Sequence, residues 1–220
     1  MLQINCHKTK EHFMKKFFIL RLPIFFILIL SISATFLFFT KPKSNHGCGN
    51  NIIAGGNAQI GGRFTLTDVN HQKIDSRDFI TKPAIIYFGY SYCPDVCPYD
   101  LQRNIIAIDI LSENGINIKP IFITIDPLRD TPDRLKEFST FIHPKLLALT
   151  GTQNEINEVM KLFKVYGQKS NENNYDKNNY LMDHSAFTYL VDSSGSLITY
   201  FNRKTSAEEM AAQISCYLTK

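Results

Sequence analysis

Two short apolar runs, at residues 84–90 and 120–125, limit the fold of this chain more than any other feature. Each run is continuous, as is typical of a strand that is buried on both faces of a sheet. Between the runs, Leu101, Ile105 and Ile108 recur at the spacing of one helical face. Strand, helix and strand in this order predict a parallel βαβ unit, because parallel strands need a long crossover between them.

Two hairpins complete the predicted sheet. The alternating residues 64–67 and the segment 73–75 predict an N-terminal hairpin. The runs 186–191 and 197–201 predict a second hairpin, because the turn residues Asp-Ser-Ser-Gly separate them. We therefore predict an α/β domain with a thioredoxin-like fold.

Capping boxes indicate where two of the helices begin. Thr152 and Glu155 have the spacing at which a threonine side chain and a glutamate cap a helix reciprocally. Thr205 and Glu208 have the same spacing, which predicts that the last helix begins after Thr205.

An apolar stretch at residues 22–39 predicts a transmembrane anchor. It holds no charged residue and is close to the length of about 20 residues that crosses a bilayer. Basic residues dominate residues 1–21, which by the positive-inside rule stay in the cytoplasm while the rest is exported. A cleaved signal peptide is the alternative, but the apolar stretch continues to Phe39, past the small residues near a candidate cleavage site.

The part after the anchor divides into a tether and one domain. Residues 40–61 are rich in Asn, Gly and Lys and predict a flexible tether, and residues 62–220 predict the thioredoxin-like domain. Within it, residues 168–179 are dense in Asn, Lys and Glu and predict a solvated insertion. Residues 1–43 hold seven of the 24 Lys and Arg but one of the 20 Asp and Glu, so the exported part is slightly acidic. This charge balance argues against nucleic-acid binding.

The spacing of Cys93 and Cys97 predicts that both are ligands of a metal site. Three residues separate them, whereas thioredoxin-type redox motifs have two. Pro98 suits the first turn of a helix, which places Cys97 at a helix N-terminus, where backbone N–H groups favour a thiolate. The best third ligand is His184, just before the apolar run that starts at residue 186.

Two thiolates and one imidazole suit copper, as Cu(I) or Cu(II), and three ligands satisfy Cu(I). Structural zinc needs a fourth ligand, and no other Cys or His has ligand spacing from these three. Asp183 is an alternative oxygen donor to Cu(II), and a structural or redox disulfide without metal is the alternative for the Cys pair. We expect Cys48 and Cys216 not to be ligands.

Three aspartates after the second apolar run suggest an acidic metal cluster at first sight. They are Asp126, Asp130 and Asp133. Acids often collect where a helix begins after a strand, because they satisfy free N–H groups there. We interpret these three as capping residues.

Three blocks of the sequence resemble the Sco (SenC) family of copper proteins: residues 93–98, residues 126–132, and Asp183-His184 ahead of a strand. The resemblance implies a thioredoxin-like domain in the periplasm, anchored in the inner membrane, or in the equivalent mitochondrial intermembrane space. It implies copper ligation by Cys93, Cys97 and His184. It also implies a partner, the binuclear copper centre of cytochrome c oxidase subunit II.

An enzymatic function is the alternative from another class. A thiol-disulfide reductase would use Cys93 and Cys97 to keep the partner's copper-ligand cysteines reduced. Such reductases carry a proline just before the strand that faces the Cys pair, where this chain has Ser185-Ala186. A peroxiredoxin relative is a weaker alternative, since it does not require the second Cys. We expect a metal carrier rather than an enzyme.

Overall fold

The computed structural model describes residue 48, residues 60–170 and residues 180–219. The described helices and strands are, in chain order, β1 (Thr65–Asp68), β2 (Lys73–Asp75), α2 (Ser76–Phe79), β3 (Ala84–Gly89), α3 (Val96–Glu113), β4 (Lys119–Thr124), α4 (Pro132–Ile142), β5 (Leu147–Thr150), α5 (Gln153–Leu162), β6 (Gly167–Lys169), β7 (Met182–His184), β8 (Thr188–Val191), β9 (Leu197–Phe201) and α6 (Ala207–Leu218).

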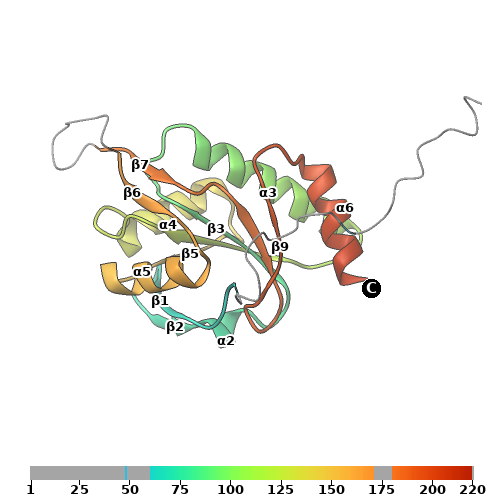
Figure 1. The fold of residues 1–220 in the computed structure, drawn as a ribbon, viewed down its shortest axis with the longest axis horizontal. Helices are drawn as coiled ribbons and strands as arrows, with labels where there is room; N and C mark the ends of the chain where they lie inside the picture. Colours follow the sequence, from blue (N-terminus) through green and yellow to red (C-terminus); the bar gives the residue numbers. More distant parts are fainter. Residues whose placement is uncertain (1–47, 49–59, 171–179, 220) are drawn as a thin grey trace, which may run out of the picture. The chain divides into compact units, whose positions relative to one another are not determined.

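A seven-stranded mixed sheet in the order β2-β1-β5-β4-β3-β8-β9 forms the centre of the domain (Figure 1). Strand β4 runs parallel to both β3 and β5. The predicted βαβ unit is therefore confirmed as β3-α3-β4, and every residue of β3 is buried, as its continuous apolar run predicted. Both predicted hairpins are also confirmed, as the antiparallel pairs β1–β2 and β8–β9.

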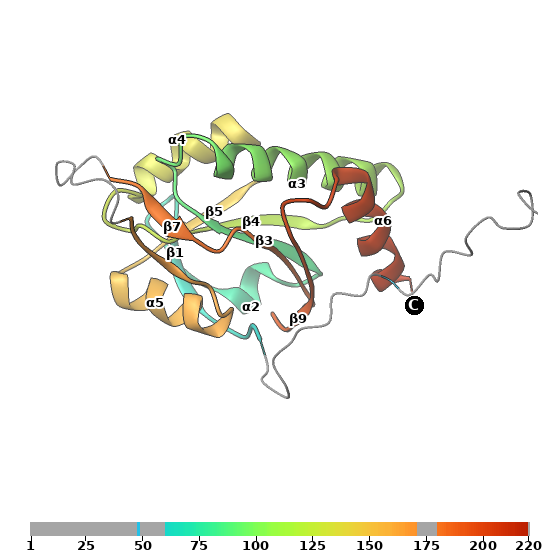
Figure 2. The same cartoon turned by 45° about the horizontal axis from the view of Figure 1, so that its top comes forward.

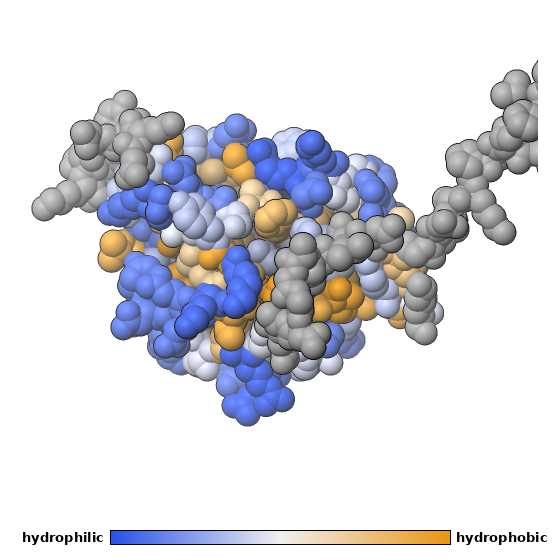
Figure 3. All heavy atoms as spheres, in the orientation of Figure 1, coloured by the Kyte–Doolittle hydropathy of each residue, from blue (hydrophilic) through white to orange (hydrophobic). Residues whose placement is uncertain are grey.

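Helices cover both faces of this sheet (Figure 2). Helices α3, α4 and α6 lie on one face, and α5 with the short α2 lies on the other. Side chains along β3 alternate between the two faces of the sheet. Ile85 packs with the buried residues of α3 and α6. The ring of Phe88 contacts that of Phe163, which follows α5, with 5.4 Å between the ring centroids. On the face seen in Figure 3, hydrophobic side chains form small separate areas among hydrophilic ones.

The two predicted capping boxes have different outcomes. Thr152 and Glu155 form the predicted capping box of α5. The predicted start of α6 is wrong by one residue, because Ser206, not Thr205, accepts a hydrogen bond from the backbone N–H of Glu209. The same four-residue spacing occurs at both positions, so the spacing alone does not decide between them.

Strands β6 and β7 form a separate two-stranded antiparallel sheet. Gln168 and Lys169, at the start of the predicted insertion, belong to β6, so this part of it is a strand. They are exposed, and a strand with no buried face has no apolar alternation that would reveal it. Residues 171–179 lie outside the described residues.

The described part of the chain contains no helix that is both long and apolar enough to cross a bilayer. The predicted cytoplasmic segment at residues 1–21 and the predicted anchor at residues 22–39 lie outside it. These boundaries, and the tether at residues 40–61, stay predictions.

A disulfide joins Cys48 to Cys216 on α6, with 5.4 Å between the Cα atoms. No pattern in the sequence predicted this bond. It links the predicted tether to the last helix, across 168 residues. Both sulfurs are used in the bond, which leaves neither as a thiolate ligand.

We expect the double variant Cys48→Ser/Cys216→Ser to be less stable by about 2–5 kcal/mol, because a cross-link over so long a loop restricts the unfolded chain. Chemical denaturation of the purified protein measures the difference. Copper binding should be unchanged in the same variant. An unaltered free energy of unfolding would contradict a stabilising role for the bond.

Candidate metal centre

Cys93 and Cys97 lie where β3 gives way to α3. Cys97 is in the first turn of α3 and is fully buried. Cys93 is in the preceding loop and is also buried, with 8% of its surface exposed. The backbone N–H of Cys97 donates a hydrogen bond to Cys93 Sγ at 3.3 Å. The helix N-terminus thus directs an N–H group at sulfur, as the position of Pro98 predicted.

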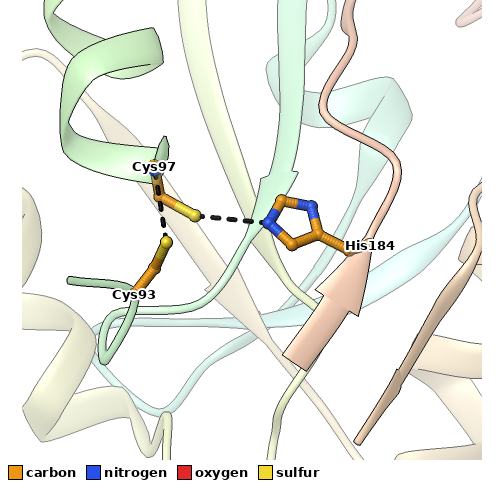
Figure 4. A group of neighbouring side chains, drawn as sticks. All are labelled: Cys93, Cys97 and His184. Carbon is orange, nitrogen blue, oxygen red and sulfur yellow. Dashed lines mark hydrogen bonds between the residues drawn. The ribbon is translucent and has the colours of Figure 1, made fainter. Parts of the chain in front are cut away.

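His184 ends β7 and faces the two sulfurs (Figure 4). Its Nδ1 lies 3.0 Å from the carbonyl oxygen of Ser185, an arrangement in which Nδ1–H donates. Nδ1 is therefore occupied by this hydrogen bond, which leaves Nε2 as the ring nitrogen available to a metal. Nε2 lies 3.6 Å from Cys97 Sγ.

The two sulfurs and the imidazole nitrogen all lie within 4.8 Å of one another. The structure thus brings together the three residues that the sequence analysis selected. Within the described residues, Asp183 and the other acids do not join this group.

Two tyrosine rings hold the imidazole edge-on. The ring of Tyr90 lies 5.9 Å from that of His184, and the ring of Tyr87 lies 6.4 Å from it, both nearly perpendicular. The Tyr87 hydroxyl donates to the buried carboxylate of Asp100 at 3.1 Å. These contacts restrict the orientation of the His184 ring.

The two cysteines share one proton. The hydrogen bond from the Cys97 thiol lowers the pKa of Cys93 to about 3, with further help from His184 and from the backbone N–H groups of Cys97 and Asp95, against the opposing effect of burial. The same hydrogen bond, together with burial, raises the pKa of Cys97 above its ordinary value. Cys93 is therefore the thiolate and Cys97 the thiol, and a metal that binds both sulfurs displaces the shared proton.

Gly89, the last residue of β3, makes room for Cys97. A Cβ atom at this position would lie 2.9 Å from Cys97 Sγ and 3.0 Å from a ring carbon of Tyr87. This role of Gly89 was not predicted from the sequence. The available signal was a glycine at the end of a buried strand, which often marks a close approach.

A cavity of about 510 Å³ opens onto the centre. Cys93 and His184 line it, together with the exposed side chains of Tyr166 and Leu181. Asp183 also lines it, whereas Cys97 does not. Anything that enters the cavity therefore meets Cys93 and His184 first.

The capping interpretation is wrong for Asp126 and Asp130. The side chain that caps α4 is Thr131, which accepts from the N–H of Arg134. Asp126 and Asp130 are both buried.

Asp130 accepts hydrogen bonds from the backbone N–H and hydroxyl of Ser91 and from the Thr124 hydroxyl. Burial raises its pKa. Asp126 forms an ion pair with Arg129. Asp133 lies in the first turn of α4, as expected, and its carboxylate contacts His71.

A family model described as SCO1/SenC matches residues 54–219. The chain belongs to the SCO1/SenC family. The family predicted from the three motif blocks is thus confirmed. Protein SenC of Rhodobacter capsulatus is 37% identical over 192 residues, which cover 87% of this chain and 86% of that relative.

Solved structures of the SCO1/SenC family share the α/β fold. Arabidopsis thaliana ScoI with copper bound matches with a TM-score of 0.68 and 32% identity, covering 73% of this chain and 98% of that one. Yeast Sco1 with copper bound matches with a TM-score of 0.67 and 36% identity, covering 73% and 89%. Both are similar proteins whose structures contain copper.

We expect Gly89→Ala to weaken copper binding by about tenfold or more, because the added methyl displaces Cys97 Sγ or Tyr87. Titration with a competing Cu(I) chelator measures the affinity. Ala148→Val, which adds volume to the buried strand β5, is the matched control for packing. Equal loss of affinity in both variants would show that Gly89 has no specific role at the centre.

Proposed function

We propose that this protein binds copper through Cys93, Cys97 and His184 and delivers it to the binuclear copper centre of cytochrome c oxidase subunit II. The observation that carries the proposal is the convergence of two sulfurs and one imidazole nitrogen within 4.8 Å. Copper-bound structures of similar family members support the choice of metal.

The chemistry of the donor set favours copper over zinc. Thiolates are soft ligands that suit Cu(I), imidazole also binds copper, and three such ligands satisfy Cu(I). Structural zinc takes four protein ligands, and the described part of the chain offers no fourth Cys, His or carboxylate in this group. The Ser185 carbonyl occupies Nδ1 of His184, which leaves Nε2 toward the sulfurs, and the pKa of about 3 favours the thiolate of Cys93, the form that binds metal. Copper is here the cargo of the protein.

We propose in addition that residues 22–39 anchor the protein in the inner membrane, with the domain in the periplasm or the mitochondrial intermembrane space. Basic residues before the apolar stretch support this orientation. The Cys48–Cys216 disulfide supports an oxidising compartment, because such bonds persist there and are rare in the cytosol.

A thiol-disulfide reductase is the second candidate function. The observation that favours it is the low pKa of Cys93, about 3, beside a protonated second cysteine. A thiolate that is accessible from a cavity is the form that attacks a disulfide. This function needs both thiols but no imidazole ligand.

Replacing any one of Cys93, Cys97 and His184 by alanine should weaken copper binding by more than about 100-fold, since three ligands leave no redundancy. Metal analysis and competition titration of the reduced protein measure stoichiometry and affinity, with one copper expected per chain. His143→Ala is the matched control, since this histidine ends α4 and its Nδ1 accepts from the N–H of Lys145. Near-normal affinity in His184→Ala would remove the proposed site.

Deletion of the gene should lower cytochrome c oxidase activity, and added copper should partly restore it. Complementation then separates the two functions, because a reductase needs Cys93 and Cys97 but not His184. A copper carrier predicts that His184→Ala and Cys93→Ser/Cys97→Ser both fail to restore the oxidase. Full restoration by His184→Ala alone would favour the reductase, and normal oxidase levels in the deletion strain would refute the partner assignment.

A further inference from the structure

The three proposed ligands are held by different means. Cys93 and Cys97 follow β3 and begin α3, inside the main sheet and its helix layer. His184 belongs to β7, which pairs with β6 in a sheet of its own. Hydrogen bonding to the main sheet therefore does not fix where His184 lies relative to the sulfurs. The chain after His184 enters β8 of the main sheet at Thr188, and side chains outside the hairpin hold the segment that precedes His184.

Arg129 attaches the segment that enters β7 to the loop after β4. Its Nη1 donates to the carbonyl oxygen of Tyr180 at 2.8 Å, and its Nε donates to Asp126 Oδ2 at 2.6 Å. The Tyr180 hydroxyl donates to Asp126 Oδ1 at 2.7 Å. Arg129, Asp126 and Tyr180 thus form a closed ring of hydrogen bonds, four residues before His184.

The same guanidinium also packs on the segment that leads to Cys93. Its Cζ atom lies 3.6 Å from the ring centroid of Tyr180, 4.8 Å from that of Tyr92 and 5.7 Å from that of Tyr90. The Tyr90 hydroxyl in turn accepts a hydrogen bond from the N–H of Met182 at 3.3 Å, two residues before His184. One cation therefore contacts both the residues before Cys93 and the residues before His184.

Burial restricts the movement of the Arg129 side chain. The Arg129 side chain is 10% exposed and that of Asp126 is 3% exposed. Nη2 of Arg129 is buried and has no hydrogen-bond partner among the described residues, so the tyrosine rings provide its surroundings. A planar guanidinium that is paired and stacked in this way holds one orientation, and a lysine does not reproduce it.

We propose that Arg129 is a positioning residue of the metal centre, which sets the distance between the His184 imidazole and the two sulfurs by joining the chain before β7 to the Cys93 loop. The inference rests on the proposed function, because it assigns His184 as a copper ligand. Arg129 itself does not touch the metal.

The test compares Arg129→Lys with Arg134→Lys in the full-length protein purified in detergent. Arg134 is the matched control, because its guanidinium also lies over the Tyr92 ring, at 4.9 Å, and its Nε donates to Ser91 Oγ. No described hydrogen bond joins Arg134 to the chain before β7. Lysine keeps the positive charge beside Asp126 in the test variant, which limits damage to the fold.

Arg129→Lys should weaken copper binding about 10- to 100-fold, the range for residues that orient a ligand, whereas Arg134→Lys should stay within about threefold of the wild type. The same substitution in the His184→Ala background should have no further effect, because Arg129 acts through His184. The nitrogen hyperfine pattern of the Cu(II) form should also change in Arg129→Lys. Equal losses with and without His184, or an unchanged affinity and spectrum, would overturn the proposal.

A measurement without copper separates this inference from the proposed function. NMR of the metal-free protein should show that Arg129→Lys shifts the ring resonances of His184 and weakens their contacts to Tyr90, whereas Arg134→Lys leaves both unchanged. Unchanged His184 resonances would refute the positioning role even if the protein binds copper. If the wild-type protein binds no copper, the proposed function is refuted. The NMR comparison of the metal-free variants still tests whether Arg129 positions His184.

Discussion

The close approach of Cys97 to the end of β3 is the constraint on which the metal centre depends. Cys97 is fully buried, and its sulfur occupies the space that a side chain at Gly89 would fill. Because α3 starts at this point, its first N–H groups reach Cys93 Sγ and its thiol shares a proton with the Cys93 thiolate. The strand, the glycine and the helix start therefore fix both sulfurs before any metal arrives.

The imidazole is held differently, and this difference suits a carrier. Two sulfurs on rigid elements supply a constant site, while the third donor lies on a two-stranded sheet that is joined to the main sheet through the short connection to β8 and by the side-chain hydrogen bonds of Arg129 and Tyr90. A ligand on this small sheet can move away from the metal at a lower free-energy cost than a ligand on a strand of the main sheet, because the free energy of local opening rises with the number of contacts that break. A carrier has to release its cargo, whereas a structural site does not.

The sequence predicted the features that local patterns encode. The continuous apolar runs predicted β3 and β4, because a strand that is buried on both faces is apolar at successive positions. The spacing of Cys93, Cys97 and Pro98 predicted that the sulfurs lie at a helix start. His184 was found from the chemistry of the donor set. The rest depends on contacts through space: the Cys48–Cys216 pairing spans 168 residues, and the burial of Asp126 and Asp130 follows from how loops pack. Neither leaves a periodic trace in the sequence.

Transfer of copper to a recipient would depend on which of the three proposed ligands line the cavity. Cys93 and His184 line the cavity, whereas Cys97 lies behind them and is fully buried. A recipient whose own ligands enter through the cavity therefore reaches the metal from the side of Cys93 and His184. Under the proposed function, ligand exchange would replace these two donors first, and Cys97 would release the copper last. Loss of the metal would restore the hydrogen bond from the Cys97 thiol to Cys93, which lowers the pKa of Cys93 and raises that of Cys97.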